Sequence, residues 1–179
     1  DTGQANAINK GISSAKGDIF AYLNSDDLYY PTTIQVIVDY FNENPYAMFV
    51  YGDALAIDHN NKSYERRHHV KATDFHELVH YGDFIVQPAA FWRRSVWEEF
   101  GAFDETYTYV FDYEYFLRIS QSIKLYYIPQ LLTQERIHPR AKTTNGGIAR
   151  IEELARLGTQ YGGHGIPQNF RPEATSIYL

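Results

Sequence analysis

The chain has 179 residues, 44% of them hydrophobic and 21% charged, which is enough apolar material for one globular domain with a hydrophobic core. Its 16 lysines and arginines are outnumbered by 22 aspartates and glutamates, and the resulting net charge of -6 argues against holding nucleic acid by bulk charge. With no cysteine, any metal ion must be bound by carboxylates, carbonyls or imidazoles. No stretch reaches the roughly 20 apolar residues of a membrane-spanning helix, and no charged-then-apolar leader begins the chain.

The first third of the chain alternates between helical and strand patterns. Apolar residues at helical spacing predict a helix over residues 4–16, and a short apolar run predicts a buried strand over residues 19–23. A second helix is expected to begin at residues 31–33 and to end at residues 44–45, before a strand over residues 47–51. Its residues Ile34, Ile37, Val38 and Phe41 are expected to share one face. This alternation is typical of a parallel sheet with crossover helices.

The remaining elements are shorter. Residues 54–58 and 63–69 predict a hairpin, and residues 73–79 predict a short capped helix. The elements expected after these are a strand over 89–92, a helical turn over 95–100, a helix over 112–122, two strands over 124–128 and 131–137 that Pro129 separates, and a helix over 148–161. Because the sequence shows no repeat, linker or low-complexity tract, we expect a single domain over residues 1–179.

A polar loop, Asn24-Ser25-Asp26-Asp27, directly follows the first predicted strand. Ligands of open α/β sheets bind beyond the carboxyl ends of the strands, so this loop lies where a site is expected. Neighbouring carboxylates repel one another unless a cation lies between them, and a Mg²⁺ or Mn²⁺ ion with open positions for phosphate oxygens would fit. The alternative is an Asx-rich turn that caps the following helix.

Asp112 and His138 are further candidates. Asp112 stands at the start of a predicted helix, where it is either a cap that interacts with the helix dipole or a base aimed into a cleft. His138 follows a predicted strand, and its imidazole is either structural or a metal ligand. Gln87 is a candidate for lining a sugar or nucleotide pocket. The basic run over residues 66–69 is interpreted as a solvated hairpin edge outside the site.

Several segments, taken in this order, resemble one family: DTGQANAINKG over residues 1–11, GDI over 17–19, NSDD over 24–27, GAFDE over 101–105 and DYEYFLR over 112–118. They resemble the family 2 glycosyltransferases of the GT-A fold, and the resemblance extends from Asp1 to about His138. It implies an α/β fold with a mixed, mostly parallel sheet flanked by helices. It also implies a metal and donor half over residues 1–58, an acceptor and catalytic-base half over 59–145, and a carboxy-terminal helix and tail over 146–179.

The resemblance implies a role for each candidate residue. The DxD signature of the family, which holds the divalent Mn or Mg ion and the ribose of a nucleotide-diphosphate sugar, matches residues 24–26. Since Asn24 replaces the first acid, Asp26 is the expected metal ligand, Asn24 is at most a ribose contact and Asp27 is the reserve. Asp112 matches the catalytic base, and His138 falls where many members have an Arg-x-His segment that reaches the metal or the diphosphate. The implied reaction is a single displacement at the anomeric carbon with inversion.

Members of this family begin with a strand, helix and strand that bind the base and ribose, and this chain starts after that part. The chain is therefore expected to be an amino-terminally truncated piece that is inactive by itself, with an exposed sheet edge that invites a homodimer. The implied partners are a nucleotide sugar and a saccharide or lipid-linked acceptor, and not nucleic acid. The implied setting is polysaccharide assembly in the cytoplasm, with peripheral association of the full protein at the inner face of the membrane.

Two other functions stay open at this point. A non-catalytic carbohydrate-binding or assembly module of the same fold is favoured by Asn24 and by the missing amino-terminal part. A nucleotidyltransferase would bind a nucleoside triphosphate through similar carboxylates, but it would require a Gly-rich basic phosphate loop that the sequence does not show.

Overall fold

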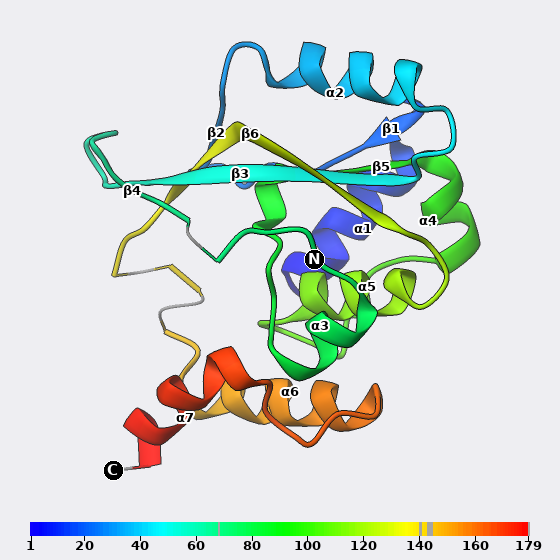
Figure 1. Cartoon of the computed structure of the whole chain (residues 1–179). Helices are drawn as coiled ribbons and strands as arrows, with labels where there is room; N and C mark the ends of the chain where they lie inside the picture. The colour runs from blue at the N-terminus through cyan, green and yellow to red at the C-terminus, as the bar shows by residue number, and fades with distance from the viewer. Residues whose placement is uncertain (68, 140, 143–144, 179) are drawn as a thin grey trace.

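The computed structural model describes residues 1–67, 69–139, 141–142 and 145–178, and its centre is a six-stranded sheet in the order β1-β5-β3-β6-β2, with β4 also paired to β3 (Figure 1). The strands are β1 (Ile19–Phe20), β2 (Leu28–Tyr29), β3 (Phe49–Ile57), β4 (Ser63–Arg66), β5 (Ala90–Arg93) and β6 (Leu125–Arg136). The helices are α1 (Gln4–Ser14), α2 (Thr33–Glu43), α3 (Phe75–His80), α4 (Arg94–Phe100), α5 (Phe111–Ser120), α6 (Gly147–Gln160) and α7 (Arg171–Tyr178), with short 3-10 turns η1 (Gln87–Ala89) and η2 (Gln168–Phe170). The predicted mixed α/β class is confirmed.

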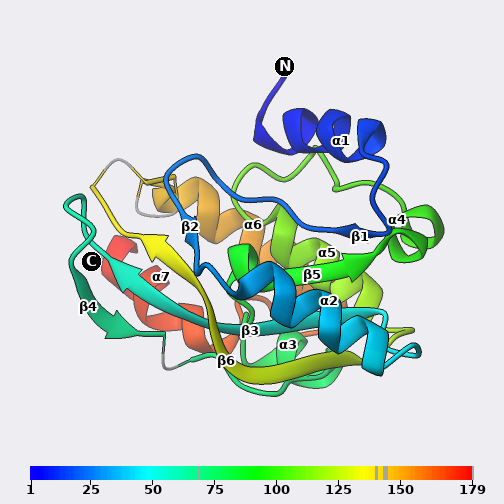
Figure 2. The same ribbon diagram turned by 90° about the horizontal axis from the view of Figure 1, so that it is seen from above.

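The sheet is mixed, but the expectation that it is mostly parallel is wrong. Among the described strands only the β3–β6 pairing is parallel, whereas β1–β5, β3–β5, β2–β6 and β3–β4 are antiparallel. The crossover through α2 does bring β1 and β3 into the same direction, as the alternation predicts. The two strands are not neighbours, however, because β5 lies between them and runs opposite to both (Figure 2).

The two predicted late strands form one long strand, β6, so the expected break at Pro129 is wrong. The ladder between β3 and β6 is parallel on both sides of this proline, and its register shifts where Gly52 pairs with Ile128 and Asp53 pairs with Leu131. A proline donates no backbone hydrogen bond, and a bulge is the place where a strand tolerates that loss. Gly52 lies opposite the bulge, where a Cβ atom would come within 2.6 Å of the Leu132 side chain.

Alternate residues of the central strands face two separate hydrophobic clusters, as strand periodicity requires. Phe49 and Tyr51 of β3 pack into the larger cluster, while Val50 between them packs into the smaller one. The smaller cluster lies under α2, and the larger cluster lies on the opposite face, where α1, α4 and α5 pack (Figure 1). The sheet is therefore buried on both faces.

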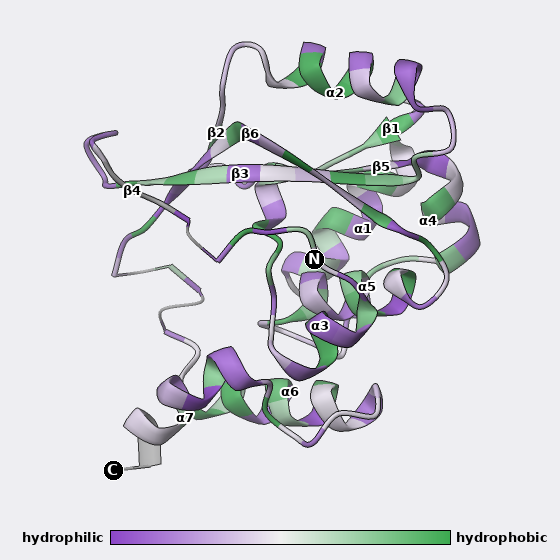
Figure 3. Ribbon diagram, viewed as in Figure 1, coloured by the Kyte–Doolittle hydropathy of each residue, from purple (hydrophilic) through white to green (hydrophobic). Residues whose placement is uncertain are grey.

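Helix α2 buries a narrower face than expected. Of the four residues expected to share one face, Ile37 and Phe41 are buried, whereas Ile34 is 54% exposed and Val38 is 37% exposed at the edge of that face. Residues three or four apart lie near each other on a helix, yet only one stripe of them reaches a flat sheet. Figure 3 shows hydrophobic and hydrophilic residues alternating along α2. No helix in the described part of the chain is long and apolar enough to cross a membrane.

Candidate active site

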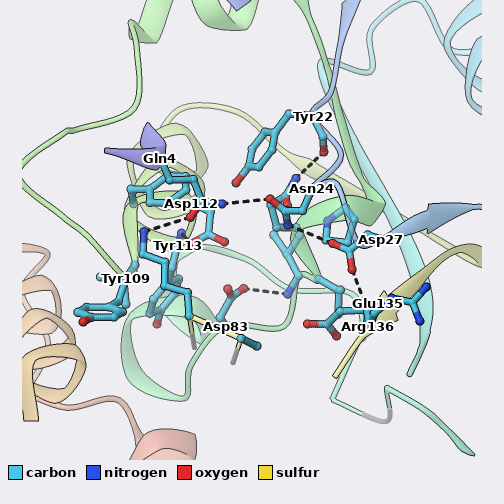
Figure 4. Close-up of a pocket in the computed structure, with 18 of the residues that line it drawn as sticks. Gln4, Tyr22, Asn24, Asp27, Asp83, Tyr109, Asp112, Tyr113, Glu135 and Arg136 are labelled. Atoms are coloured by element: carbon cyan, nitrogen blue, oxygen red, sulfur yellow. Dashed lines mark hydrogen bonds between the residues drawn. The ribbon is translucent and has the colours of Figure 1, made fainter. Parts of the chain in front are cut away.

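The candidate residues meet beyond the carboxyl ends of the strands. Strands β1, β3 and β6 run in one direction, so the segments that follow them lie at one edge of the sheet. A cavity of about 510 Å³ opens there. The residues that line it include Asn24, Asp26, Asp27, Gln87 and Asp112, which the sequence singles out. Figure 4 shows Asn24, Asp27 and Asp112 among them. His138 is not a lining residue, but it contacts one of them.

Asn24 makes a hydrogen bond within the polar loop and holds the loop to two other segments of the chain, α1 and η1. Its amide nitrogen donates to Asp27 Oδ2 at 3.0 Å and to Gln87 Oε1 at 3.2 Å, while its amide oxygen accepts from Gln4 Nε2 at 3.0 Å. Gln87 in turn donates to the Tyr22 carbonyl at 2.7 Å. Both ends of the Asn24 amide are engaged by protein, so Asn24 positions the loop in this structure.

Asp27 is buried and both of its carboxylate oxygens accept hydrogen bonds from protein. Oδ1 accepts from the backbone N–H of Arg136 at 2.9 Å, and Oδ2 accepts from Asn24. Burial raises the pKa of the Asp27 carboxyl, although these two hydrogen bonds oppose the shift. This geometry favours a role for Asp27 in joining the loop to the end of β6.

Asp26 and His138 face each other at the outer end of the loop. His138 Nε2 lies 3.1 Å from Asp26 Oδ2, and the two side chains are 26% and 41% exposed. At this distance the two groups are hydrogen-bonded to each other. A carboxylate oxygen and an imidazole nitrogen are also the ligand types by which a divalent transition-metal ion such as Mn²⁺ could be held here. No group of three or more histidines, aspartates or glutamates in the described ranges is placed to hold a metal ion. Substrate phosphates and water would have to supply the remaining ligands, as is common for these ions.

Arg136 fixes the backbone on which Asp26 stands. Its Nε donates to the Asp26 carbonyl at 2.8 Å, and its terminal nitrogens donate to the Asp58 carbonyl and, at 2.6 Å, to Asn61 Oδ1. The guanidinium thus joins the loop after β1 to the hairpin turn after β3.

Asp112 lies in the first turn of α5, on the opposite side of the cavity from Arg136 (Figure 4). Its Oδ1 accepts from the Tyr113 backbone N–H at 2.8 Å. Burial raises the pKa of the Asp112 carboxyl, and the positive charges of Arg150 and Lys142 partly offset this. A raised pKa brings a carboxylate closer to the range in which a general base works.

The segment that leads into α5 is held by a carboxylate from α6. Glu153 accepts hydrogen bonds from three consecutive backbone N–H groups, those of Thr108 at 2.7 Å, Tyr109 at 2.7 Å and Val110 at 3.3 Å. Successive N–H groups that converge on one anion form a compact and strongly charge-assisted contact. Helix α6 therefore fixes the position from which Asp112 enters the cavity.

The cavity also has charged side chains that the sequence analysis did not place there, among them Asp83, Lys142 and Arg67. Arg67 pairs with Glu135 at 2.7 Å, so the interpretation of residues 66–69 as a solvated edge is wrong for Arg67, because the hairpin folds back toward β6. His68 lies outside the described residues. Lys142 donates to Gln4 Oε1 at 3.0 Å. Asp83 and Lys142 lie between predicted elements and Arg67 lies within the predicted hairpin, and sequence alone does not show that these segments converge.

A mixed sheet with a carboxylate-lined cavity at its strand ends is the arrangement expected of a GT-A-type glycosyltransferase fold, and the comparisons agree with it. The family model described as glycosyl transferase family 2 matches residues 1–116. An uncharacterized glycosyltransferase of Rickettsia typhi is 28% identical over 167 residues, which cover 87% of this chain and 50% of that protein. The chain belongs to glycosyl transferase family 2 and spans about half the length of the curated relatives it matches.

Two solved structures share the fold. TarS 1-349 of S. aureus in complex with UDP-GlcNAc has a TM-score of 0.66 and 10% sequence identity, over 89% of this chain and 47% of that one. The mannosyltransferase PcManGT from Pyrobaculum calidifontis, in complex with GDP-Man and Mn2+, has a TM-score of 0.58 and 17% identity, over 98% of this chain and 49% of that one. At these identities the likeness shows the fold alone.

Proposed function

We propose that this chain carries the metal-binding and base-bearing part of an inverting glycosyltransferase, which moves a sugar from a nucleotide-diphosphate donor to a saccharide or lipid-linked acceptor. The observation that carries the proposal is that Asp112 and the Asp26–His138 pair approach one cavity from different elements. The nucleotide sugars bound to TarS and PcManGT, and the Mn2+ in the latter, support the same class of donor.

In this proposal Asp112 acts as the general base. Its carboxylate accepts the proton of the acceptor hydroxyl as that oxygen attacks the anomeric carbon, and the bond to the nucleoside diphosphate breaks on the opposite side. The hydroxyl must come within about 3 Å of the carboxylate for this transfer. Tyr113 N–H holds the orientation of the carboxylate, and the Glu153 contact holds the start of α5.

The leaving diphosphate gathers negative charge, and Asp26 and His138 are the side chains placed to bring a cation to it. A bound Mn²⁺ or Mg²⁺ ion supplies charge neutralisation there. Lys142 lies on the same cavity, and burial lowers the pKa of its ammonium group while the Asp112 and Glu153 charges oppose the shift. Its positive charge also stabilises the ionised form of Asp112.

The test is calorimetric titration of UDP and GDP, each with and without Mn²⁺, into the full-length gene product and into this chain. We expect Mn²⁺-dependent binding to the full-length protein that is lost in Asp26→Ala and kept in Asp18→Ala, an exposed aspartate before β1. Release of nucleoside diphosphate from a nucleotide sugar, lost in Asp112→Asn, then shows turnover. Binding without release in the wild type would instead indicate a carbohydrate-binding module, and absence of nucleotide binding would refute the transferase proposal.

A further inference from the structure

Asp83 is a carboxylate of the cavity that the proposed mechanism does not use. It lies between α3 and η1 and lines the same cavity as Asp112. One oxygen, Oδ1, accepts from the Ile85 backbone N–H at 2.9 Å. The other oxygen has no hydrogen-bond partner among the described residues, and Figure 4 shows the carboxylate pointing into the cavity.

The turn at Asp83 does not by itself require a carboxylate. The same kind of turn occurs outside the cavity at Asp104, whose Oδ1 accepts a hydrogen bond from the Thr106 N–H two residues later at 2.9 Å. Asparagine and serine make such turns as well. At Asp83 the charge is costly, because burial and the nearby charge of Asp112 raise the pKa of this carboxyl well above its usual range. A carboxylate kept at such a cost in a cavity indicates a ligand contact.

The place of Asp83 in the cavity suggests which ligand it meets. The charged groups that act on Asp83 are Asp112 and Glu135, which raise its pKa, and Arg150, which lowers it. Figure 4 shows its carboxylate between Asp112 and the Glu135–Arg136 end of β6. In the proposed reaction the donor sugar spans this same interval, from the diphosphate near Asp26 to the base. Asp83 therefore flanks the sugar ring and not the nucleotide.

We propose that Asp83 hydrogen-bonds a hydroxyl group of the donor sugar and so orients its ring between the leaving diphosphate and Asp112. The inference rests on the proposed function and adds a sugar-binding residue to it. A hydrogen bond to a carboxyl group depends on the position of the sugar hydroxyl. A site that forms this bond therefore binds sugars without a hydroxyl group at that position less well. Asp83 would thus help to select the donor sugar.

The test compares the affinity for a nucleotide sugar with the affinity for its bare nucleotide, in Mn²⁺ and on the full-length protein. The probes are UDP-GlcNAc against UDP and GDP-mannose against GDP. The variants are Asp83→Ala and Asp83→Ser, since serine can still accept the Ile85 N–H but is too short to reach the ligand. Asp104→Ser is the matched control, because it changes the same kind of turn away from the cavity.

We expect the ratio of the two dissociation constants to change by about twofold to tenfold in both Asp83 variants, the effect of one lost hydrogen bond. The affinity for the bare nucleotide and the ratio in Asp104→Ser should not change. The inference would be overturned if the folded Asp83→Ser variant had the same ratio as the wild type. That result is expected if Asp83 contacts the acceptor or only stabilises the turn. If the wild type binds none of the four probes, the proposed function fails first.

Discussion

Replacing Glu153 with alanine should destabilise the protein by about 2 kcal/mol. A hydrogen bond to a charged group contributes about 1.5–3 kcal/mol, and Glu153 accepts two of good length and a longer third. At the lower figure the two good bonds give about 3 kcal/mol. We reduce this to about 2 kcal/mol because the side chain is partly exposed, so that water can replace it, and because alanine has a slightly better helix propensity.

The neighbouring Glu152 provides the control. It has the same charge, stands in the same helix and is exposed, and it makes no hydrogen bond among the described residues. Urea unfolding of Glu153→Ala should show a midpoint lower by about 1 M at an unchanged slope, whereas Glu152→Ala should stay within about 0.5 kcal/mol of the wild type. Equal midpoints for the two variants would refute the reasoning that this carboxylate holds residues 108–110.

The same variant should also affect the site. Residues 108–110 lead directly into α5, so loosening them displaces Asp112 relative to the acceptor while leaving the loop at Asp26 in place. In the proposed transferase, Glu153→Ala should therefore lower the turnover rate and leave Mn²⁺-dependent nucleotide binding intact. Loss of both together, at a temperature where the variant is folded, would show that the contact acts on the whole cavity and not on α5.

The other predictions concern the proposed site and one close backbone contact. Removing metal ions with EDTA should weaken nucleotide binding as much as Asp26→Ala does, and a variant that still responds to Mn²⁺ in calorimetry would contradict the ligand assignment. Asp112→Asn should reduce transfer about 10²- to 10⁴-fold. Burial raises the pKa of Asp112, and a general base must be ionised to accept a proton. The wild-type rate should therefore fall as the pH decreases, with the midpoint of the fall above the ordinary aspartate pKa of about 4. A midpoint at or below pH 4 would count against Asp112 as the base. Gly158→Ala should strongly lower the midpoint of thermal unfolding, because the added Cβ would lie 1.8 Å from the Gly165 carbonyl oxygen. Gly11→Ala has open space around it and should stabilise the protein by up to about 1 kcal/mol. Equal midpoints for the two variants would refute this prediction.

Local signals in the sequence predicted the helices well. Helices α1, α5 and α6 appear in the structure close to their expected bounds, because apolar residues recur at helical spacing in each and pack into the core. The short helix α3 begins as its capping residues predict, with Asp74 accepting from the Glu77 N–H at 2.9 Å. Neighbouring strands were harder to predict, because the insertion of β5 between β1 and β3 depends on contacts between segments far apart in sequence.

In the candidate site, too, local sequence signals could be recognised, whereas contacts between distant segments could not. Asp26 follows a strand and Asp112 begins a helix, which are positions where ligand-binding residues are expected in α/β folds. The structure brings both to one cavity. The sequence does not mark Asp83 or Glu153 as functional. Asp83 has the pattern of an ordinary turn residue, and Glu153 has that of a surface residue of an amphipathic helix. Their partners, Ile85 for the first and residues 108–110 for the second, are visible only after folding.

If residues 24–26 match the DxD signature, as the resemblance implies, Asn24 replaces its first acid, and the contacts of Asn24 give a physical reason for that difference. Its amide nitrogen donates to two acceptors, Asp27 Oδ2 and Gln87 Oε1. An aspartate at this position would have no donor for either oxygen and would place a second negative charge against the buried Asp27, whose pKa burial already raises. The loop therefore keeps its shape through the asparagine, which leaves Asp26 as its outward carboxylate beside His138.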